Sequence, residues 1–223
     1  MRVITLIVFD LDGTLIDSAP DLQAALNTML TEAGRRPLLL DEVIAIVGDG
    51  AGVLVRRALA ITGGLGAESE TDRLLARFLA IYEAHAADLT YAYCGVEQTL
   101  AALRAAGFRL GICTNKPERM SCAILAKLGL DSYFSAVIGG DSVPGARKPD
   151  PRHLEAALVA LGGAADQAVM VGDSINDVAA ARSLGVPVIV RTGGYGAVPT
   201  EDLGADIIIR EFAELPAAIS RLS

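Results

Sequence analysis

The sequence predicts an α/β protein: a doubly wound, Rossmann-like parallel sheet with an all-helical insertion after its first strand. Val3 to Phe9 is a nearly continuous apolar and β-branched run, which is typical of a strand covered on both faces. Similar short runs alternate with helical stretches later in the chain, which is the pattern of a parallel sheet built from βαβ units. Residues 17–92, in contrast, show helical periodicity and no convincing strand.

The elements follow in order along the chain. Further strands are expected at Leu110 to Thr114, Ala136 to Gly139, Ala168 to Gly172, Pro187 to Val190 and Ile207 to Ile209. Helices are expected between most of them, at Val96 to Ala106, Pro117 to Leu128, Pro151 to Leu161 and Asn176 to Leu184. The insertion offers helices at Leu22 to Ala33, Asp41 to Val47, Gly52 to Thr62 and Asp72 to Ala87. We therefore divide the chain into a core, residues 1–16 and 93–223, and a helical cap, residues 17–92.

Composition limits the partners. The chain has 223 residues, a net charge of -8 and a pI near 4.8. Nucleic acids and acidic membranes are bound by dense Lys/Arg patches, so neither is an expected partner, and an anionic small molecule needs a local site. Cys94, Cys113 and Cys122 lack zinc-ligand spacing, and we interpret them as ordinary thiols that suit a reducing cytoplasm. The run from Val3 to Phe9 is too short to span a bilayer and has no signal-peptide flanks, so a cytoplasmic location is expected. Nothing indicates the oligomeric state.

Four groups of polar residues lie in the segments that connect predicted strands to the helices after them. Asp10-Leu11-Asp12-Gly13-Thr14 comes directly after the first strand, where an Asp-rich turn is the simpler alternative. Thr114 and Asn115 carry donors suited to a phosphate oxygen, although a helix N-cap would use the same residues. Lys148 stands in a Pro-flanked loop, where a solvated lysine is the alternative. Gly172-Asp173-Ser174-Ile175-Asn176-Asp177 places two carboxylates four residues apart, and helix capping accounts for one of them.

This ordered set resembles the haloacid dehalogenase superfamily of aspartyl-phosphate enzymes, and its phosphoglycolate phosphatase branch in particular. The resemblance covers essentially the whole chain and rests on four motifs: Asp10-Leu11-Asp12-Gly13-Thr14, Thr114-Asn115-Lys116-Pro117, Lys148-Pro149-Asp150-Pro151 and Gly172-Asp173-Ser174-x-x-Asp177. It implies a Mg²⁺-dependent phosphatase for a small phosphate monoester, with 2-phosphoglycolate as the leading candidate. A broad phosphatase for sugar or nucleotide phosphates, a phosphosugar mutase and a non-catalytic binding protein remain alternatives.

The resemblance also assigns roles to the motif residues. Asp10 is the expected nucleophile, and Asp10, Asp173 and the backbone carbonyl of Asp12 are the expected Mg²⁺ ligands, oriented from behind by Asp177. Asp12 is the expected general acid and base, for which it needs a raised pKa. The phosphate-binding residues are expected to be Thr114, Asn115 and Lys148.

Two related activities are disfavoured by the same residues. Dehalogenating relatives lack the acid two residues after the nucleophile, whereas Asp12 is present here. Phosphonate-cleaving relatives use a cap lysine for a Schiff base, and no lysine occurs from Asp17 to Thr90.

Substrate choice is expected to depend on the cap loop from Val47 to Gly52. The backbone amides around Gly48 and Gly50 can bind a carboxylate, although an ordinary loop before a helix has the same sequence. Arg56 is the candidate cation; it and Arg57 differ by about 100° around a helix, so at most one faces the site. Asp49 would repel an anionic leaving group unless it points away.

Three remaining features are assigned no chemistry. His85 and His153 lie outside every motif, and we interpret both as surface or packing residues. Gly193-Gly194-Tyr195-Gly196 is expected to form a turn after the fifth core strand.

Overall fold

A computed structural model describes residues 3–196 and 198–222 and contains a parallel six-stranded sheet. The strand order is β5-β4-β1-β6-β7-β8, so the chain starts in the middle, winds to one edge and then to the other. This is the doubly wound topology that the sequence predicts, and the fold class is confirmed. The strands are β1 (Leu6–Phe9), β4 (Arg109–Cys113), β5 (Ala136–Ile138), β6 (Ala168–Gly172), β7 (Val188–Arg191) and β8 (Ile207–Ile209).

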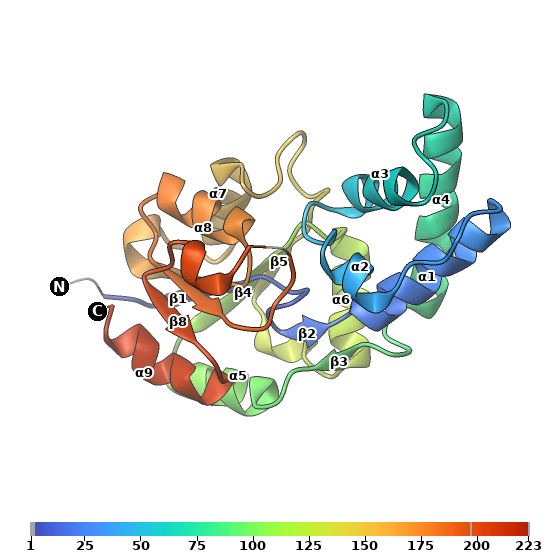
Figure 1. The fold of residues 1–223 in the computed structure, drawn as a ribbon. Coiled ribbons are helices and arrows are strands. Elements are labelled where there is room, and N and C mark those ends of the chain that lie inside the picture. Colours follow the sequence, from blue (N-terminus) through green and yellow to red (C-terminus); the bar gives the residue numbers. More distant parts are fainter. Residues whose placement is uncertain (1–2, 197, 223) are drawn as a thin grey trace.

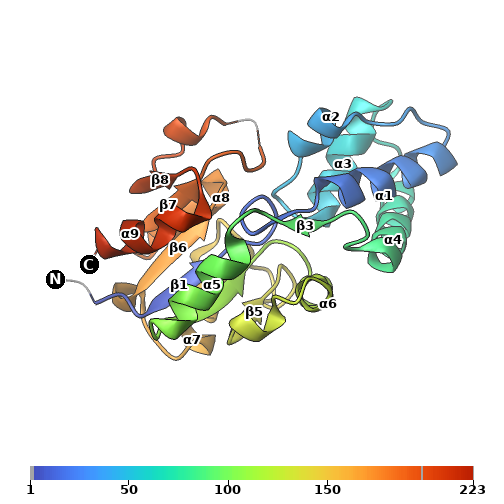
Figure 2. The same cartoon turned by 90° about the horizontal axis from the view of Figure 1, so that it is seen from below.

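Helices cover both faces of this sheet (Figures 1 and 2). One face carries α5 (Val96–Ala105), α6 (Glu118–Lys127) and α9 (Leu215–Ser220), and the other carries α7 (Pro151–Ala160) and α8 (Ile175–Ser183). Short 3₁₀ helices complete the core: η1 (Asp131–Tyr133), η2 (Ala165–Gln167), η3 (Thr200–Asp202) and η4 (Phe212–Glu214). Four of the five α-helices were predicted within two residues at each end, and α9 was not predicted.

The alternation of side chains along β1 explains why this strand is apolar throughout. Ile7 and Phe9 pack into one hydrophobic core, whereas Leu6 and Val8 pack into the other, and all four are fully buried. Because successive side chains of a strand point to opposite faces, a strand between two helical layers needs apolar residues at every position. The polar residue that ends the run, Asp10, therefore lies at the rim of both cores.

Four helices between the first two core strands form a separate lobe, which lies away from both chain ends (Figure 1). They are α1 (Ala19–Glu32), α2 (Leu40–Ile44), α3 (Ala51–Ile61) and α4 (Glu68–His85), so all four predicted helices are present. Helix α1 begins where Pro20 supplies a fixed φ and Asp21 an acidic side chain in the first turn. Its apolar side packs on α4, where Phe78 and Tyr82 stack with ring centroids 5.7 Å apart.

Two very short strands join this lobe to the core, and the expectation of no strand in residues 17–92 is wrong at its two ends. Strand β2 (Ile16–Asp17) pairs antiparallel with β3 (Tyr91–Ala92). Two residues are too few to show an alternating pattern, so these strands could not be predicted from periodicity. The pair coincides with the proposed boundaries of the cap, near residues 16 and 92.

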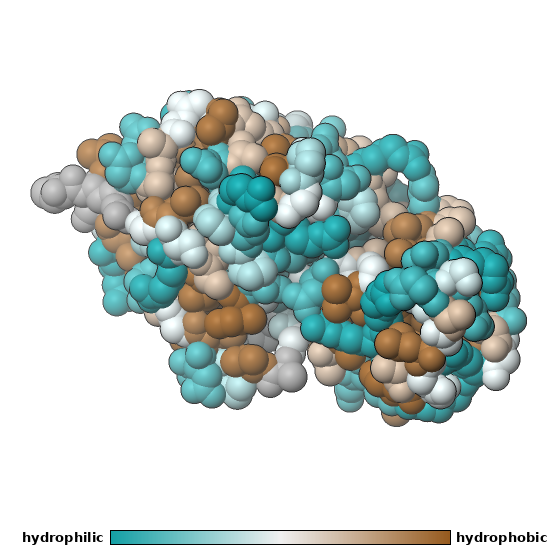
Figure 3. Space-filling view, turned by 90° about the horizontal axis from the view of Figure 1, so that it is seen from above, coloured by the Kyte–Doolittle hydropathy of each residue, from teal (hydrophilic) through white to brown (hydrophobic). Residues whose placement is uncertain are grey.

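The surface is mixed in character. Seen from above, hydrophilic residues gather over the middle of the molecule, between the larger lobe with the sheet and the smaller helical lobe (Figure 3). Within residues 3–196 and 198–222, no helix combines the length and the apolar character needed to cross a bilayer.

Candidate active site

The predicted site residues meet where the strand order reverses. Asp10 follows β1, Thr114 follows β4 and Asp173 follows β6, and these three strands are neighbours in the sheet. Because all of the strands are parallel, their carboxyl ends lie on one edge, which is where open α/β sheets bind ligands. The sheet thereby brings together residues that are up to 163 positions apart in the chain.

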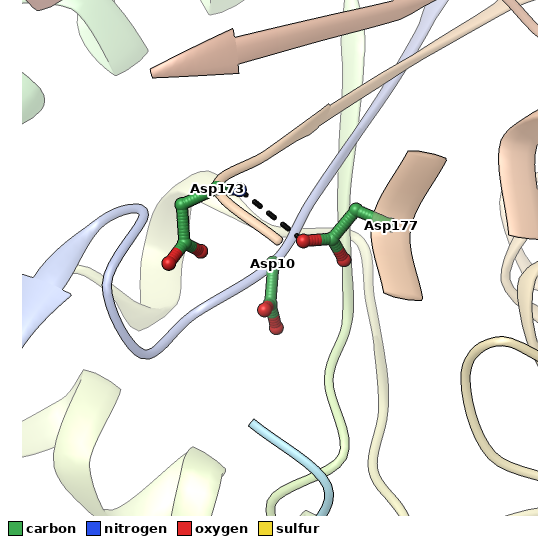
Figure 4. Close-up of side chains that lie close together, drawn as sticks. All are labelled: Asp10, Asp173 and Asp177. Carbon is green, nitrogen blue, oxygen red and sulfur yellow. Dashed lines mark hydrogen bonds between the residues drawn. The ribbon is translucent and has the colours of Figure 1, made fainter. Parts of the chain in front are cut away.

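Three buried carboxylates form the centre of the site. Oxygens of Asp10, Asp173 and Asp177 lie within 4.8 Å of one another, and Figure 4 shows them converging from the ends of β1 and β6 and from α8. Asp177 is held on both oxygens. Its Oδ1 accepts a hydrogen bond from Lys148 Nζ at 2.6 Å, and its Oδ2 accepts from the backbone N–H groups of Asp173 and Ser174 at 3.2 and 3.0 Å. Asp177 thus caps α8 and orients Lys148.

Asp173 is held in a similar way. Its Oδ1 accepts a hydrogen bond from the Thr14 hydroxyl at 2.6 Å, and its Oδ2 accepts from the Tyr195 N–H at 2.7 Å. Gly13 is required beside it, because Gly13 has φ +81° and a Cβ there would lie 2.3 Å from Asp173 Oδ2. The glycine of the first motif therefore makes room for the carboxylate of the last one.

Lys148 is the counter-charge of the cluster. Its side chain is 1% exposed, and its Nζ lies 2.8 Å from Asp10 Oδ1 and 2.6 Å from Asp177 Oδ1. Burial opposes the charge of Lys148, but the two carboxylates outweigh it and raise its pKa above the ordinary value. Lys148 is therefore an ammonium group clamped beside the predicted nucleophile.

The cluster carries more negative charge than Lys148 balances. Burial raises the pKa of Asp10 to about 6 although Lys148 opposes this, and burial together with Asp10 and Asp177 raises the pKa of Asp173. The buried Asp10 Oδ1 has no hydrogen-bond donor aligned on it, despite the nearby ammonium. Carboxylate oxygens at this spacing are ligands of the kind that Mg²⁺ takes, so the residues present fit a divalent cation.

Asp12 lies beside this cluster but is directed toward different partners. Lys116 Nζ lies 2.9 and 3.0 Å from its two carboxylate oxygens, and the Ser18 hydroxyl donates to Oδ1 at 2.5 Å. Lys116 also donates to the Tyr82 hydroxyl at 2.6 Å. Lys116 belongs to a predicted motif, but no role of its own was predicted for it. Tyr82 was not predicted as a site residue, because its place in the apolar stripe of α4 indicates only a core residue.

Thr114 and Asn115 differ in what they can still offer a phosphate. Thr114 Oγ1 accepts from the Lys116 N–H at 3.3 Å, which leaves its hydroxyl hydrogen free to donate. The Asn115 amide already donates to the carbonyls of Gly48 and Lys148, both at 2.9 Å. Its Oδ1 is buried without a partner. Asn115 thus connects the cap loop to the loop of Lys148.

A cavity opens between the carboxylates and the helical lobe, and we call it the central cavity. Of the three residues expected to govern specificity, Gly48 and Gly50 line it and Arg56 does not. Arg56 is exposed and forms an ion pair with Glu68 of α4. The full lining is Asp10, Asp12, Leu22, Val47, Gly48, Gly50, Ala51, Leu54, Phe78, Leu79, Tyr82, Thr114, Asn115, Lys116, Pro117 and Met120.

Asp49, which was expected to repel an anionic leaving group, is held by two neighbouring side chains. Asp49 forms an ion pair with Arg57 at 2.5 Å and accepts a hydrogen bond from Asn176 Nδ2 at 2.7 Å. Arg57, and not Arg56, is therefore the arginine that lies nearer to the site, where it lines a second cavity with Asp10 and Asp173. Its charge is already neutralised by Asp49.

The comparisons with known proteins agree with this geometry. A family model described as haloacid dehalogenase-like hydrolase matches residues 4–185. A phosphoglycolate phosphatase of Caulobacter vibrioides is 44% identical over 212 residues, which cover 95% of this chain and 89% of that protein. One of Rhodospirillum rubrum is 47% identical over 214 residues, covering 94% and 88%.

Solved structures give the same picture. The crystal structure of a predicted phosphoglycolate phosphatase from Haemophilus somnus superposes with a TM-score of 0.92 at 33% identity, covering 97% of this chain and 98% of that one. The chain therefore belongs to the haloacid dehalogenase-like hydrolases, as its motifs predicted, and it is similar to phosphoglycolate phosphatases over nearly its whole length.

Proposed function

We propose that this hydrolase is a Mg²⁺-dependent phosphatase that acts through an aspartyl-phosphate on Asp10, with 2-phosphoglycolate as its substrate. The observation that carries the proposal is the pairing of Asp10 with a buried ammonium group, Lys148, at the rim where Thr114 and Asp173 also meet. A carboxylate attacking a phosphate must overcome the repulsion between two negative groups, and this arrangement supplies positive charge where they meet.

In the first step, a carboxylate oxygen of Asp10 attacks phosphorus and the bond from phosphorus to the ester oxygen breaks. Lys148 and the Thr114 hydroxyl offset the charge on the transferring oxygens. Asp10, Asp173 and the backbone carbonyl of Asp12 would hold the Mg²⁺ ion, which when bound supplies further positive charge at the phosphate. Asp177 keeps Lys148 and the backbone of Asp173 in place throughout.

In the same step Asp12 gives a proton to the departing ester oxygen. A water molecule then attacks phosphorus and the bond between phosphorus and the Asp10 oxygen breaks, while Asp12 takes a proton of that water. This releases inorganic phosphate, restores the Asp10 carboxylate and leaves Asp12 protonated for the next turnover. For either transfer, an oxygen of Asp12 has to exchange Lys116 or Ser18 for the reacting group, because both of its oxygens are engaged.

The central cavity favours a small leaving group. On the cap side its side chains are mostly apolar, among them Leu22, Leu54 and Phe78, and the Tyr82 hydroxyl already accepts a hydrogen bond from Lys116, so few partners remain for the hydroxyl groups of a sugar. Burying such hydroxyls without partners costs about 1–3 kcal/mol each. The similarity to phosphoglycolate phosphatases supports the same choice.

The test is phosphate release from a panel of monoesters that includes 2-phosphoglycolate, a sugar phosphate and a nucleotide, with Mg²⁺ or with chelator. Asp10→Asn should lower kcat by about 10⁴-fold or more, whereas the matched exposed variant Asp166→Asn should leave it unchanged. Substantial turnover by Asp10→Asn would rule out the aspartyl-phosphate. Comparable kcat/KM for all esters would leave a broad phosphatase, and no hydrolysis of any ester would indicate a binding protein.

A further inference from the structure

We propose that Lys116 selects substrates whose leaving group carries a carboxylate, by binding that carboxylate in place of Asp12. The proposal rests on the proposed phosphatase function and names the chain's own determinant of substrate class. Lys116 is not among the cap residues that the sequence suggested as determinants of substrate specificity.

Lys116 contacts residues of both lobes, and these contacts hold it in the central cavity. Its side chain is 4% exposed, and its Nζ reaches Asp12 on one side and the hydroxyl of Tyr82 from α4 on the other. The ammonium also lies 4.7 Å from the centroid of the Tyr82 ring, within the range of a cation–π contact. Among the residues that the structure describes, Lys116 is the one cationic side chain that lines the central cavity.

Two of the other cations near the cap loop already have acidic partners. Arg57 is paired with Asp49, and Arg56 is paired with Glu68 outside the cavity. The partner of Lys116 is different in kind, because Asp12 is the residue that has to protonate the ester oxygen. A buried ammonium group is costly without an anion beside it.

Lys116 can exchange its partner when a substrate enters the central cavity. Its ammonium lines the cavity and is held there by Asp12 and by the neutral Tyr82 hydroxyl. A carboxylate on the leaving group offers the ammonium a charge-assisted hydrogen bond, whereas a neutral alcohol offers only a weaker, uncharged one. Substrates with a carboxylate are thus favoured.

The chain of atoms in 2-phosphoglycolate suits this geometry. One methylene carbon separates its ester oxygen from its carboxyl carbon, so a cation that binds the carboxylate must adjoin the acid that protonates the ester oxygen. Lys116 meets this condition, because its Nζ lies 2.9 and 3.0 Å from the Asp12 oxygens.

The test compares two esters of similar size, 2-phosphoglycolate and 2-hydroxyethyl phosphate, in which a neutral CH₂OH group replaces the carboxylate. The measured quantity is the ratio of their kcat/KM values for wild type, Lys116→Met and the matched control Lys127→Met, whose lysine is exposed and paired with Asp88. A lost charge-assisted hydrogen bond corresponds to about a 10- to 100-fold change. We expect the ratio to fall by that factor in Lys116→Met, mainly through KM for 2-phosphoglycolate, and to stay constant in Lys127→Met.

Failure of this proposal is distinguishable from failure of the proposed function. If wild type prefers 2-phosphoglycolate and Lys116→Met lowers both kcat/KM values equally, Lys116 only positions Asp12 and the selection role is overturned. If wild type hydrolyses both esters equally well, the phosphatase stands while the selection role and the proposed substrate both fall.

Folding of the variant does not limit the test. Glycolate should inhibit wild-type hydrolysis of 2-hydroxyethyl phosphate more strongly than ethylene glycol does. Equal inhibition by the two would overturn the role of Lys116 without any substitution.

Discussion

Removing one oxygen atom, that of the Tyr195 hydroxyl, should loosen the junction between the two lobes. This hydroxyl accepts hydrogen bonds from the N–H groups of Ser18 and Ala19 at 2.7 and 2.8 Å, and it donates to Asp17 Oδ1 at 2.7 Å. The three partners form the end of β2 and the start of α1. Burial raises the pKa of Tyr195, so the hydroxyl remains a donor at every pH of interest.

The cost of Tyr195→Phe follows from which groups are left without a partner. Ser18 is fully buried, so its N–H would lose its acceptor at a cost of about 1–3 kcal/mol. The Ala19 N–H keeps a second acceptor, Asp17 Oδ1 at 3.1 Å. The lost bond to Asp17 adds about 1 kcal/mol. The sum is a loss of about 2–4 kcal/mol in the free energy of unfolding, or roughly 5–15 °C in Tm for a chain of this size.

Urea unfolding followed by far-ultraviolet circular dichroism is the appropriate assay, because the chain has no Trp to report fluorescence. Tyr91→Phe is the matched control: the Tyr91 hydroxyl donates to the other Asp17 oxygen at 3.0 Å, but that side chain is exposed. We expect it to change the free energy of unfolding by less than about 0.5 kcal/mol. Equal and small effects of the two substitutions would refute the reasoning.

Three further outcomes are expected. Mg²⁺ at about 100 times its dissociation constant should stabilise the protein by about 2.7 kcal/mol in thermal unfolding, and Asp173→Asn should remove most of this effect; a shift of equal size in the variant would argue against a site at Asp173. Asp12→Asn should lower kcat by about 10²- to 10⁴-fold, which single-turnover phosphate release can measure; an unchanged rate would remove Asp12 as the acid. Burial lowers the pKa of His153 below 6.5 in the folded protein. As the pH falls below 6.5, the unfolded chain therefore binds a proton at this residue more readily than the folded chain does. The free energy of unfolding should decline over that range, having been unaffected by His153 above pH 6.5. His153→Gln should flatten this decline in urea titrations between about pH 7 and 5, and an identical pH dependence would contradict the assignment.

Much of the fold was predictable because its signals are local. A strand covered on both faces must be apolar at every position, so runs such as Val3 to Phe9 marked the core strands within a few residues. The site residues were predictable for a related reason. Carboxyl ends of parallel strands share one edge, so polar residues after β1, β4 and β6 had to meet.

The short strands and the choice between arginines were not predictable in this way. Strands β2 and β3 form because the chain leaves and re-enters the core at the same place, and two residues carry no periodic signal. Arg56 and Arg57 have the same chemistry and adjacent positions. Only the packing of α3 against α4 decides that Arg56 meets Glu68 while Arg57 meets Asp49.

The sequence by itself determined the family, the succession of core strands along the chain, the doubly wound fold class and the set of polar residues at the carboxyl ends of the strands. The tertiary structure alone decided which distant residues these side chains contact, both within the core and across the two lobes. Lys116 meets Asp12 and Tyr82, which are 104 and 34 positions away, and Tyr195 meets Ser18, 177 positions away. Contacts of this kind depend on how the helical lobe docks on the sheet, and docking is set by the shape of whole surfaces, which no local pattern of residues encodes.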